Sequence, residues 1–168
     1  MKLSQDFYTS EAKWVAQQLI GCSIVRTFSN NEPVRFLITE TEAYLGMHDK
    51  ACHASKGRTA RTEVMFCQGG IIYMYLIYGM HWMFNVVTGL NESPQAVLIR
   101  GVQGAIGPGR VTRLLHIDKS FNGESLTDSV NIWIESATQK SKFTSTARVG
   151  INYAGPYWSK RKLRFVIK

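Results

Sequence analysis

Residues 73–80 read Tyr73-Met74-Tyr75-Leu76-Ile77-Tyr78-Gly79-Met80, which places three tyrosines within six residues, immediately before a glycine. A strand that only fills a core more often carries Val, Ile or Leu, because a buried tyrosine hydroxyl needs a hydrogen-bond partner. The alternating pattern runs from residue 71 to residue 88 and is interrupted only at Tyr78-Gly79. We therefore predict two strands joined as a protruding β-hairpin.

A second unusual stretch, Thr39-Glu40-Thr41-Glu42-Ala43-Tyr44, places acidic residues and a tyrosine at the end of an apolar run. We predict strands over 22–28 and 34–41 that pair as a hairpin through the turn residues between them. Flat aromatic rings near basic residues suit stacking on nucleobases. Our hypothesis is that the Glu42 carboxylate and a tyrosine-lined slot together handle a single purine, with Glu40 on the opposite face of the strand.

The remaining segments favour an α+β fold with a single domain over residues 1–168. Apolar residues recur with helical spacing over 12–20, and a glycine-rich turn at 104–110 precedes a predicted short helix over 111–116. Short strands are predicted at 96–101, 130–136 and 163–168. Few helices and many short strands indicate a curved, mostly antiparallel sheet with flanking helices.

The formal charge of +8 and the pI near 9.6 are the strongest compositional signal. Such a surface attracts polyanions, so nucleic acid is the leading partner, with anionic membranes and acidic proteins behind it. Residues 46–63 form a predicted loop that carries Lys50, Lys56, Arg58 and Arg61. We interpret this loop as a candidate phosphate clamp, with a solvated connector as the alternative.

Several classes of protein are disfavoured. No apolar run is long enough to span a bilayer and the N-terminus lacks a signal-peptide layout, so we expect a soluble, intracellular protein. The three cysteines lack metal-ligand spacing, and a reducing compartment accounts for them without disulfides. Adjacent Cys52 and His53 argue against a catalytic dyad, because a nucleophile and its base must face each other. The chain also lacks the Gly-Lys-Ser/Thr of a P-loop, which disfavours nucleotide hydrolysis.

Taken together, the motifs resemble the alkyladenine (3-methyladenine) DNA glycosylases of the mammalian type, in the order of that family and over nearly the whole chain. The combination is specific, although each piece alone would not be. The matching segments are Glu40–Gly46, His53, Met65-Phe66, Gly70–Asn85, Val97–Arg100, Gly107–Gly109, Lys119–Phe121, Ala147–Ile151 and Leu163–Phe165.

This resemblance implies an enzyme that flips a damaged purine out of duplex DNA and hydrolyses its N-glycosidic bond without a metal or organic cofactor. By the same resemblance, Glu42 is the general base that activates water, and Arg100 lies near the catalytic water and the target phosphate. The flipped base is expected to be contacted by Tyr44 and Tyr75 on its faces, His53 at its edge, Tyr73 behind His53, and Asn85 on the pocket floor.

The DNA surface follows from the same comparison. Tyr78 is expected at the hairpin tip as a wedge in the minor groove, with Met80 beside it. Arg58, Thr59 and Arg61 are expected to contact the DNA backbone. The predicted partner is double-stranded DNA with a damaged purine, bound by a monomer with no membrane association. None of the positions that match the family carries a lysine that could act as a Schiff-base nucleophile. Strand cleavage is therefore not expected.

The chemistry of an alkylated base agrees with a mechanism that uses a single carboxylate as the base. Alkylation at N3 or N7 gives a purine positive charge, which improves both its departure and its stacking on tyrosine, by about 0.5–2 kcal/mol for the cation–π part. Ordinary glycoside hydrolysis uses a carboxylate pair. Neutral lesions such as hypoxanthine would need protonation as well, and the sequence offers no clear second acid.

Simpler explanations exist for every one of these residues. Glu42 could be an exposed carboxylate, and Tyr44 and Tyr75 could be core residues. Tyr78 could be an ordinary turn aromatic, His53 a loop histidine, Asn85 a hydrogen-bonded strand residue and Arg100 the partner of a carboxylate.

The rival functions are a non-catalytic lesion-binding module and an RNA-binding domain whose tyrosines stack single-stranded bases. The chain also departs from the family pattern. Only residues 101–106 connect Arg100 to the glycine-rich turn, His81 replaces the usual aromatic, and Arg110 stands where a lysine is expected. These departures bear on DNA affinity and substrate range more than on the chemistry.

Overall fold

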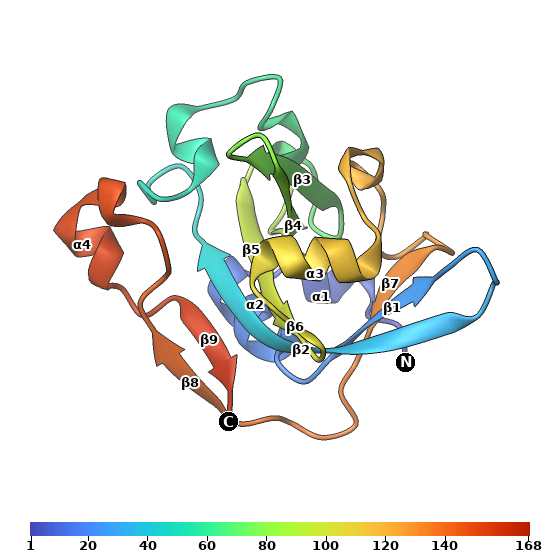
Figure 1. Cartoon of the computed structure of the whole chain (residues 1–168). Coiled ribbons are helices and arrows are strands. Elements are labelled where there is room, and N and C mark those ends of the chain that lie inside the picture. Colours follow the sequence, from blue (N-terminus) through green and yellow to red (C-terminus); the bar gives the residue numbers. More distant parts are fainter.

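The computed structural model describes residues 1–168 and contains a large antiparallel sheet that does not close into a barrel (Figure 1). This confirms the predicted α+β class. The main path of hydrogen-bonded strands is β3 (Ile72–Ile77), β4 (His81–Thr88), β5 (Gln95–Val102), β2 (Pro33–Tyr44), β1 (Ser23–Thr27) and β7 (Ile132–Glu135). Off this path, β6 (Ala105–Ile106) pairs with β5, β9 (Arg164–Ile167) pairs with β2, and β8 (Phe143–Thr146) pairs with β9.

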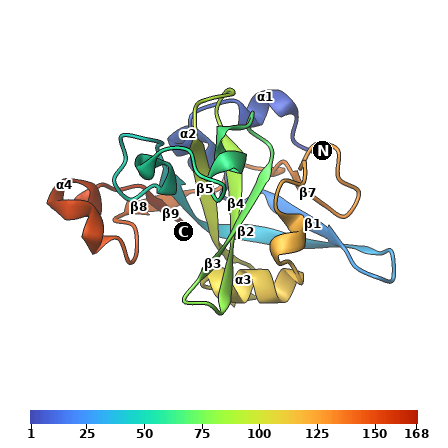
Figure 2. The same ribbon diagram turned by 90° about the horizontal axis from the view of Figure 1, so that it is seen from above.

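Helices cover the central strands from two sides. Figures 1 and 2 show α1 (Gln5–Tyr8) and α2 (Ala12–Leu19) on one side of β4 and β5, and α3 (Pro108–Leu115) on the other. The last helix, α4 (Gly155–Lys160), lies with β8 and β9 at one flank of the molecule. Short 3₁₀ turns are η1 (His53–Lys56), η2 (Glu63–Phe66), η3 (Lys119–Phe121) and η4 (Asn152–Ala154).

The main core lies between α2, α3 and the sheet. The predicted apolar stripe of α2 is buried at Ala12, Val15, Ala16 and Leu19. These residues join a cluster of 26 buried apolar side chains that includes strand residues from both ends of the sheet. Full burial of one such aliphatic side chain is worth about 1.5–3 kcal/mol. The core therefore holds the strands rigidly where they carry the site.

The predicted hairpin is present as β3 and β4, paired from Ile72↔Val86 to Ile77↔His81. Its tip is the three-residue turn Tyr78–Met80, in which Tyr78 takes a φ of 53° and Gly79 a φ of 67°. A positive φ is uncommon for an aromatic residue, whereas glycine adopts it freely. Figure 2 shows β3 and β4 as a two-stranded arm. The aromatic side chain of Tyr78, in the turn at its end, is exposed.

Strand β2 is longer than predicted and irregular near its middle. It continues to Tyr44, and its pairing with β5 shifts register on both sides of Glu40. Gly101 faces this irregularity, and a Cβ there would lie 3.0 Å from the Glu40 Cβ and 3.0 Å from the Thr39 Oγ1. The absence of a side chain at Gly101 allows β5 to approach β2 closely at Glu40.

Other differences from the sequence prediction are local. The segment 5–8 forms the short helix α1, although its four residues carry no recognisable helical pattern. The loop over 46–63 contains the turn η1 and the start of η2, which packing rather than periodicity specifies. The short connection after Arg100 closes as a tight β5–β6 hairpin, with Val102 paired to Ala105. None of the helices combines the length and the apolar character that spanning a bilayer requires.

Candidate active site

A cavity at one edge of the sheet gathers the predicted base-binding residues, although they lie far apart in the sequence. Residues from the end of β2, the η1 and η2 loops, the hairpin and the C-terminal segment form its walls. The lining residues are Tyr44, Ala51, Cys52, His53, Met65, Tyr73, Tyr75, Asn85, Ala96 and Tyr153. All five residues predicted to bind the base are in this set.

His53 packs tightly against the two hairpin tyrosines. Its ring centroid lies 4.4 Å from that of Tyr75 and 6.1 Å from that of Tyr73, both in edge-on geometry. The His53 Nδ1 is 2.9 Å from the Tyr73 hydroxyl oxygen. This contact orients the imidazole, and the contact of His53 with the edge of a bound base stays a prediction.

The histidine is neutral in its surroundings. Burial is the main cause that lowers the His53 pKa to about 4, and the cations of Arg61 and Lys56 lower it further. Burial likewise raises the Tyr73 pKa to about 12. Near neutral pH the edge of the cavity therefore presents an uncharged imidazole and an uncharged phenol, which together can donate and accept hydrogen bonds.

Asn85 lies beneath these rings on the neighbouring strand. It is buried, and its Nδ2 donates to the Tyr73 carbonyl over 3.3 Å and to the Met83 carbonyl over 3.4 Å. Both contacts are within the strand pair, so Asn85 fits the simpler explanation of a hydrogen-bonded strand residue. Its side chain also lines the cavity. Its amide orientation is fixed by these two carbonyls.

Glu42 is fully buried next to the cavity rather than in its wall. Its Oε2 accepts a hydrogen bond of 2.8 Å from the Tyr44 hydroxyl, and its Oε1 accepts one of 3.1 Å from the Val149 backbone N–H. The side chain of Tyr44 therefore connects the carboxylate to the aromatic cavity. The alternative of an exposed surface carboxylate does not hold.

Arg100 contacts two carboxylates. Its Nε lies 2.9 Å from Glu40 Oε1 and 3.5 Å from Glu42 Oε1, and its side chain is 20% exposed. Glu40 also accepts a hydrogen bond from Arg164. The expectation that Glu40 and Glu42 lie on opposite faces is wrong, because side chains two residues apart in a strand point to the same face. The cluster is thus a buried acidic pair held by two arginines.

Burial and charge act in opposite directions on Glu42. Burial raises the pKa of its carboxyl, and the Arg100 cation, the Val149 N–H, the Tyr44 hydroxyl and the more distant Arg148 oppose that rise. A carboxylate with a raised pKa is a better proton acceptor than an exposed one, provided that it still ionises near neutral pH. These contacts suit Glu42 to general base chemistry.

The wedge residues lie at the hairpin tip, away from the core. The Tyr78 side chain is 87% exposed and Met80 is 68% exposed. Exposed apolar side chains on a rigid projecting turn suit insertion between bases. The structure places both where the sequence predicted them, and their contact with DNA stays a prediction.

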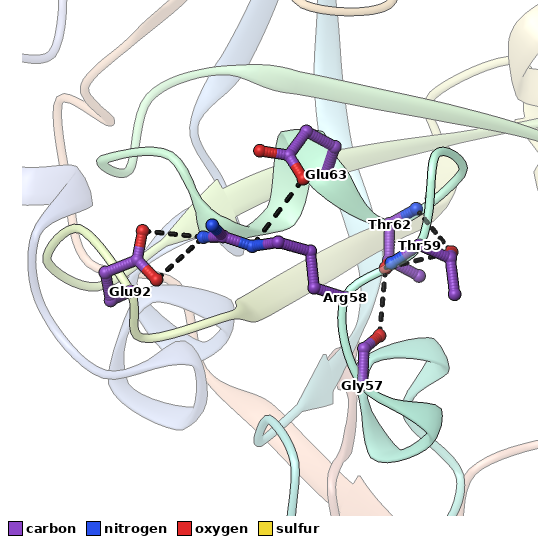
Figure 3. A network of polar contacts seen from close by, with 6 residues as sticks. All are labelled: Gly57, Arg58, Thr59, Thr62, Glu63 and Glu92. Atoms are coloured by element: carbon purple, nitrogen blue, oxygen red, sulfur yellow. Dashed lines mark hydrogen bonds and ion pairs between the residues drawn. The ribbon is translucent and has the colours of Figure 1, made fainter.

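The basic loop divides into two parts. Arg58 is held by Glu92, with its Nη2 2.6 Å and 2.7 Å from the two carboxylate oxygens, and its Nε lies 3.6 Å from Glu63 (Figure 3). Thr59 makes hydrogen bonds with Thr62 in the same loop (Figure 3). The predicted DNA contacts of Arg58 and Thr59 stay predictions, and each residue already has internal partners.

Arg61, in contrast, faces the site. Its guanidinium lies 5.5 Å from the centroid of the Tyr75 ring. It also lines a second cleft, which carries Lys50 and Lys56 and shares Cys52, His53 and Tyr153 with the aromatic cavity. Basic side chains therefore line a cleft that adjoins the aromatic cavity, where they suit contact with phosphate groups.

Several contributors escaped the sequence prediction. Val149 acts only through its backbone N–H, which leaves no trace in residue type. Tyr153 lines both the cavity and the basic cleft, and its hydroxyl donates to the Ala51 carbonyl over 3.2 Å. Asp49 and Arg148 form a buried ion pair behind Tyr44. The Ala147–Ile151 motif was the only signal that pointed to this segment.

Cys52 lies in the wall, but burial raises its pKa to about 11. The side chain is therefore a neutral thiol at physiological pH, which agrees with the argument against a cysteine nucleophile. No group of three or more His, Cys, Asp or Glu side chains comes together with geometry suited to a metal ion.

Comparison with known proteins agrees with this geometry. The family model for Methylpurine-DNA glycosylase (MPG) matches residues 6–106 and 102–168. The two matched segments meet at the β5–β6 hairpin, where the sequence predicted a shortened connection. Relatives from Natranaerobius thermophilus and Methanocella arvoryzae are each 39% identical, over 95% and 91% of this chain and 92% and 86% of their own lengths. A relative from Borrelia garinii subsp. bavariensis is 38% identical over 96% of this chain and 94% of its own length. All three carry the name "Putative 3-methyladenine DNA glycosylase".

These findings define the class first: the protein is a DNA glycosylase, an N-glycosyl hydrolase whose substrate is DNA. More particularly, the chain belongs to the methylpurine-DNA glycosylase family.

Proposed function

We propose that this enzyme removes alkylated purines of the 3-methyladenine type from duplex DNA, as the first step of base excision repair. The observation that carries the proposal is the hydrogen bond between the Glu42 carboxylate and the hydroxyl of Tyr44, a wall of the aromatic cavity. It connects a buried proton acceptor to a space lined by uncharged rings. The names of the relatives support the same substrate class.

The damaged nucleotide rotates out of the helix, because C1′ of its sugar is out of reach within the stack. Tyr78 then fills the vacated space from the hairpin tip. The base enters between Tyr44 and Tyr75, with the neutral His53 at its edge. Since every residue in these roles belongs to one chain, the proposal includes action as a monomer.

Glu42 takes a proton from a water molecule as the water oxygen bonds to C1′. The C1′–N bond breaks, and its electron pair leaves with the base. A base that was cationic through alkylation departs neutral, so no acid is needed. The products are the free purine and an abasic site with an intact strand, which makes the enzyme monofunctional. Arg100, bonded to Glu40 and near Glu42, supplies positive charge beside the attacking water.

Base release from a duplex with one 7-methylguanine tests the proposal. We expect Glu42→Gln to reduce single-turnover release by about 10²–10⁴-fold, the usual contribution of a general base. Glu40→Gln is the matched control, because Glu40 is also buried and also contacts Arg100, but it makes no hydrogen bond with Tyr44. We expect that control to retain far more activity. Equal losses in the two variants would contradict the assigned base.

A fold control accompanies the assay. Because burial raises the pKa of Glu42 in the folded state, this group favours folding most below its unfolded pKa, and that contribution is lost as the pH rises through the folded pKa. Glu42→Gln removes the ionisation, so urea unfolding at pH 7 is expected to show stability equal to or above that of the wild type.

Tight binding of the lesion without release by the wild type would instead mark a non-catalytic binding module.

A further inference from the structure

The Asp49–Arg148 ion pair lies directly behind Tyr44. Arg148 Nη1 and Nη2 are 2.6 Å and 2.9 Å from the two oxygens of Asp49, and both side chains are 0% exposed. Asp49 also accepts backbone hydrogen bonds from Leu45 and Ala51, so both of its oxygens are fully used. This is a closed, bidentate pair with no access to solvent.

The guanidinium covers one face of the Tyr44 ring, with Cζ 4.8 Å from the ring centroid. Arg148 is not among the residues that line the cavity, whereas Tyr44 is. The cation therefore lies on the face of Tyr44 that points away from the cavity. Its Nε has no hydrogen-bond partner, and Nη1 additionally donates to the Ala43 carbonyl over 2.9 Å.

This arrangement creates an electrostatic problem for the proposed substrate. A purine stacked on the open face of Tyr44 would lie about 3.5–4 Å beyond the ring, at van der Waals contact. An alkylated base carries positive charge, so two cations would be separated by one aromatic ring, about 8–9 Å apart. A guanidinium stays protonated even when buried, so its charge can be neutralised only by a paired anion.

Building on the proposed function, we infer that Asp49 sets the selectivity of the cavity for cationic bases, by neutralising Arg148 behind the ring on which the base stacks. Arg148 anchors Tyr44 and the segment that presents the Val149 N–H to Glu42. Asp49 allows that anchor to be used without repelling a charged purine. It is a positioning residue with an electrostatic effect on specificity, and it does not touch the substrate.

The size of the effect follows from the geometry. Two unit charges about 8 Å apart, at the effective dielectric constant of about 20 that fits protein sites, change binding by about thirtyfold. Asp49→Asn leaves Arg148 charged and unpaired, so it should weaken binding of a cationic base by about ten- to thirtyfold relative to a neutral base of the same shape.

The experiment compares two duplexes that differ only in charge, one with 7-methylguanine and one with 7-methyl-7-deazaguanine at the same position. Binding is measured by fluorescence anisotropy in a Glu42→Gln background, in which release is expected to be too slow to disturb the measurement. We expect the preference for the charged base to fall in Asp49→Asn and to return in the double variant Asp49→Asn/Arg148→Met, which removes both charges. Arg148→Met alone should keep or increase the preference.

The outcomes separate electrostatics from structure. A purely structural role predicts that each single variant weakens both duplexes equally and that the double variant is no better, and this result would overturn the inference. If circular dichroism shows that Asp49→Asn is unfolded, Arg148→Met and the double variant test the inference instead. A weaker preference for the charged base in Arg148→Met would then overturn the inference. Equal binding of lesion and undamaged duplexes would also do so. Failure of the wild type to release 7-methylguanine would overturn the proposed function alone, because the binding preference does not depend on catalysis.

Discussion

Replacing Tyr44 with phenylalanine removes one hydroxyl and keeps the ring that the base is proposed to stack on. The lost contact is the 2.8 Å hydrogen bond to Glu42 Oε2, whereas the Val149 N–H and Arg100 remain beside Oε1. A hydrogen bond to a charged group contributes about 1.5–3 kcal/mol. Because the other contacts partly compensate, we take the lower value, which corresponds to about one pKa unit.

The sign is upward. The hydroxyl stabilises the ionised carboxylate, so its removal raises the Glu42 pKa and leaves less of the active, ionised form at a given pH. We expect the acidic limb of the single-turnover rate profile to move up by about one pH unit. Below that limb the rate should fall about tenfold, while the plateau at higher pH should change little.

Release of 7-methylguanine between pH 5 and pH 9 measures this profile, with Tyr75→Phe as the control. Tyr75 also lines the cavity, but no hydrogen bond joins it to Glu42. Loss of the Tyr75 hydroxyl should therefore leave the acidic limb of the rate profile at the same pH. A uniform loss of rate at every pH in Tyr44→Phe, or a limb that does not move, would refute the coupling of the cavity wall to the base.

Two further predictions concern the DNA surface. Tyr78→Ala should weaken capture of a lesion-containing duplex and slow excision while thermal unfolding stays unchanged, because the side chain is 87% exposed; unchanged binding and excision would count against the wedge. Arg61→Ala should weaken DNA binding and reduce the dependence of log K on log salt by about one. Arg58→Ala should change both much less, because Glu92 and Glu63 already pair with Arg58, and equal effects in the two variants would show that this pairing opens on DNA.

Local pattern determined much of the fold. The alternation of residues 71–88, broken at Tyr78-Gly79, specified the β3–β4 hairpin and its exposed tip, and the helical spacing of residues 12–20 specified α2. These elements follow from periodicity and turn chemistry, which depend on neighbours in the sequence. The helix α1 carries no such signal, because four residues are too few for a period to be recognised.

The candidate site was only partly predictable. The resemblance to the glycosylase family singled out Glu42, Tyr44, His53, Tyr75 and Asn85, and the structure brings all of them together at or beside one cavity. The position of Glu40 was predicted wrongly, since it shares Arg100 with Glu42.

The sequence by itself thus determined the hairpin, the amphipathic helix and the aromatic residues from which the cavity is built. Only the tertiary structure decided that Arg58 is held by acidic partners, that a backbone N–H from Val149 reaches Glu42, and that Asp49 meets Arg148 99 residues further along the chain. The physical reason is range. Periodicity and turn propensity act over a few residues, whereas ion pairing and burial act between groups that only the folded chain brings into contact.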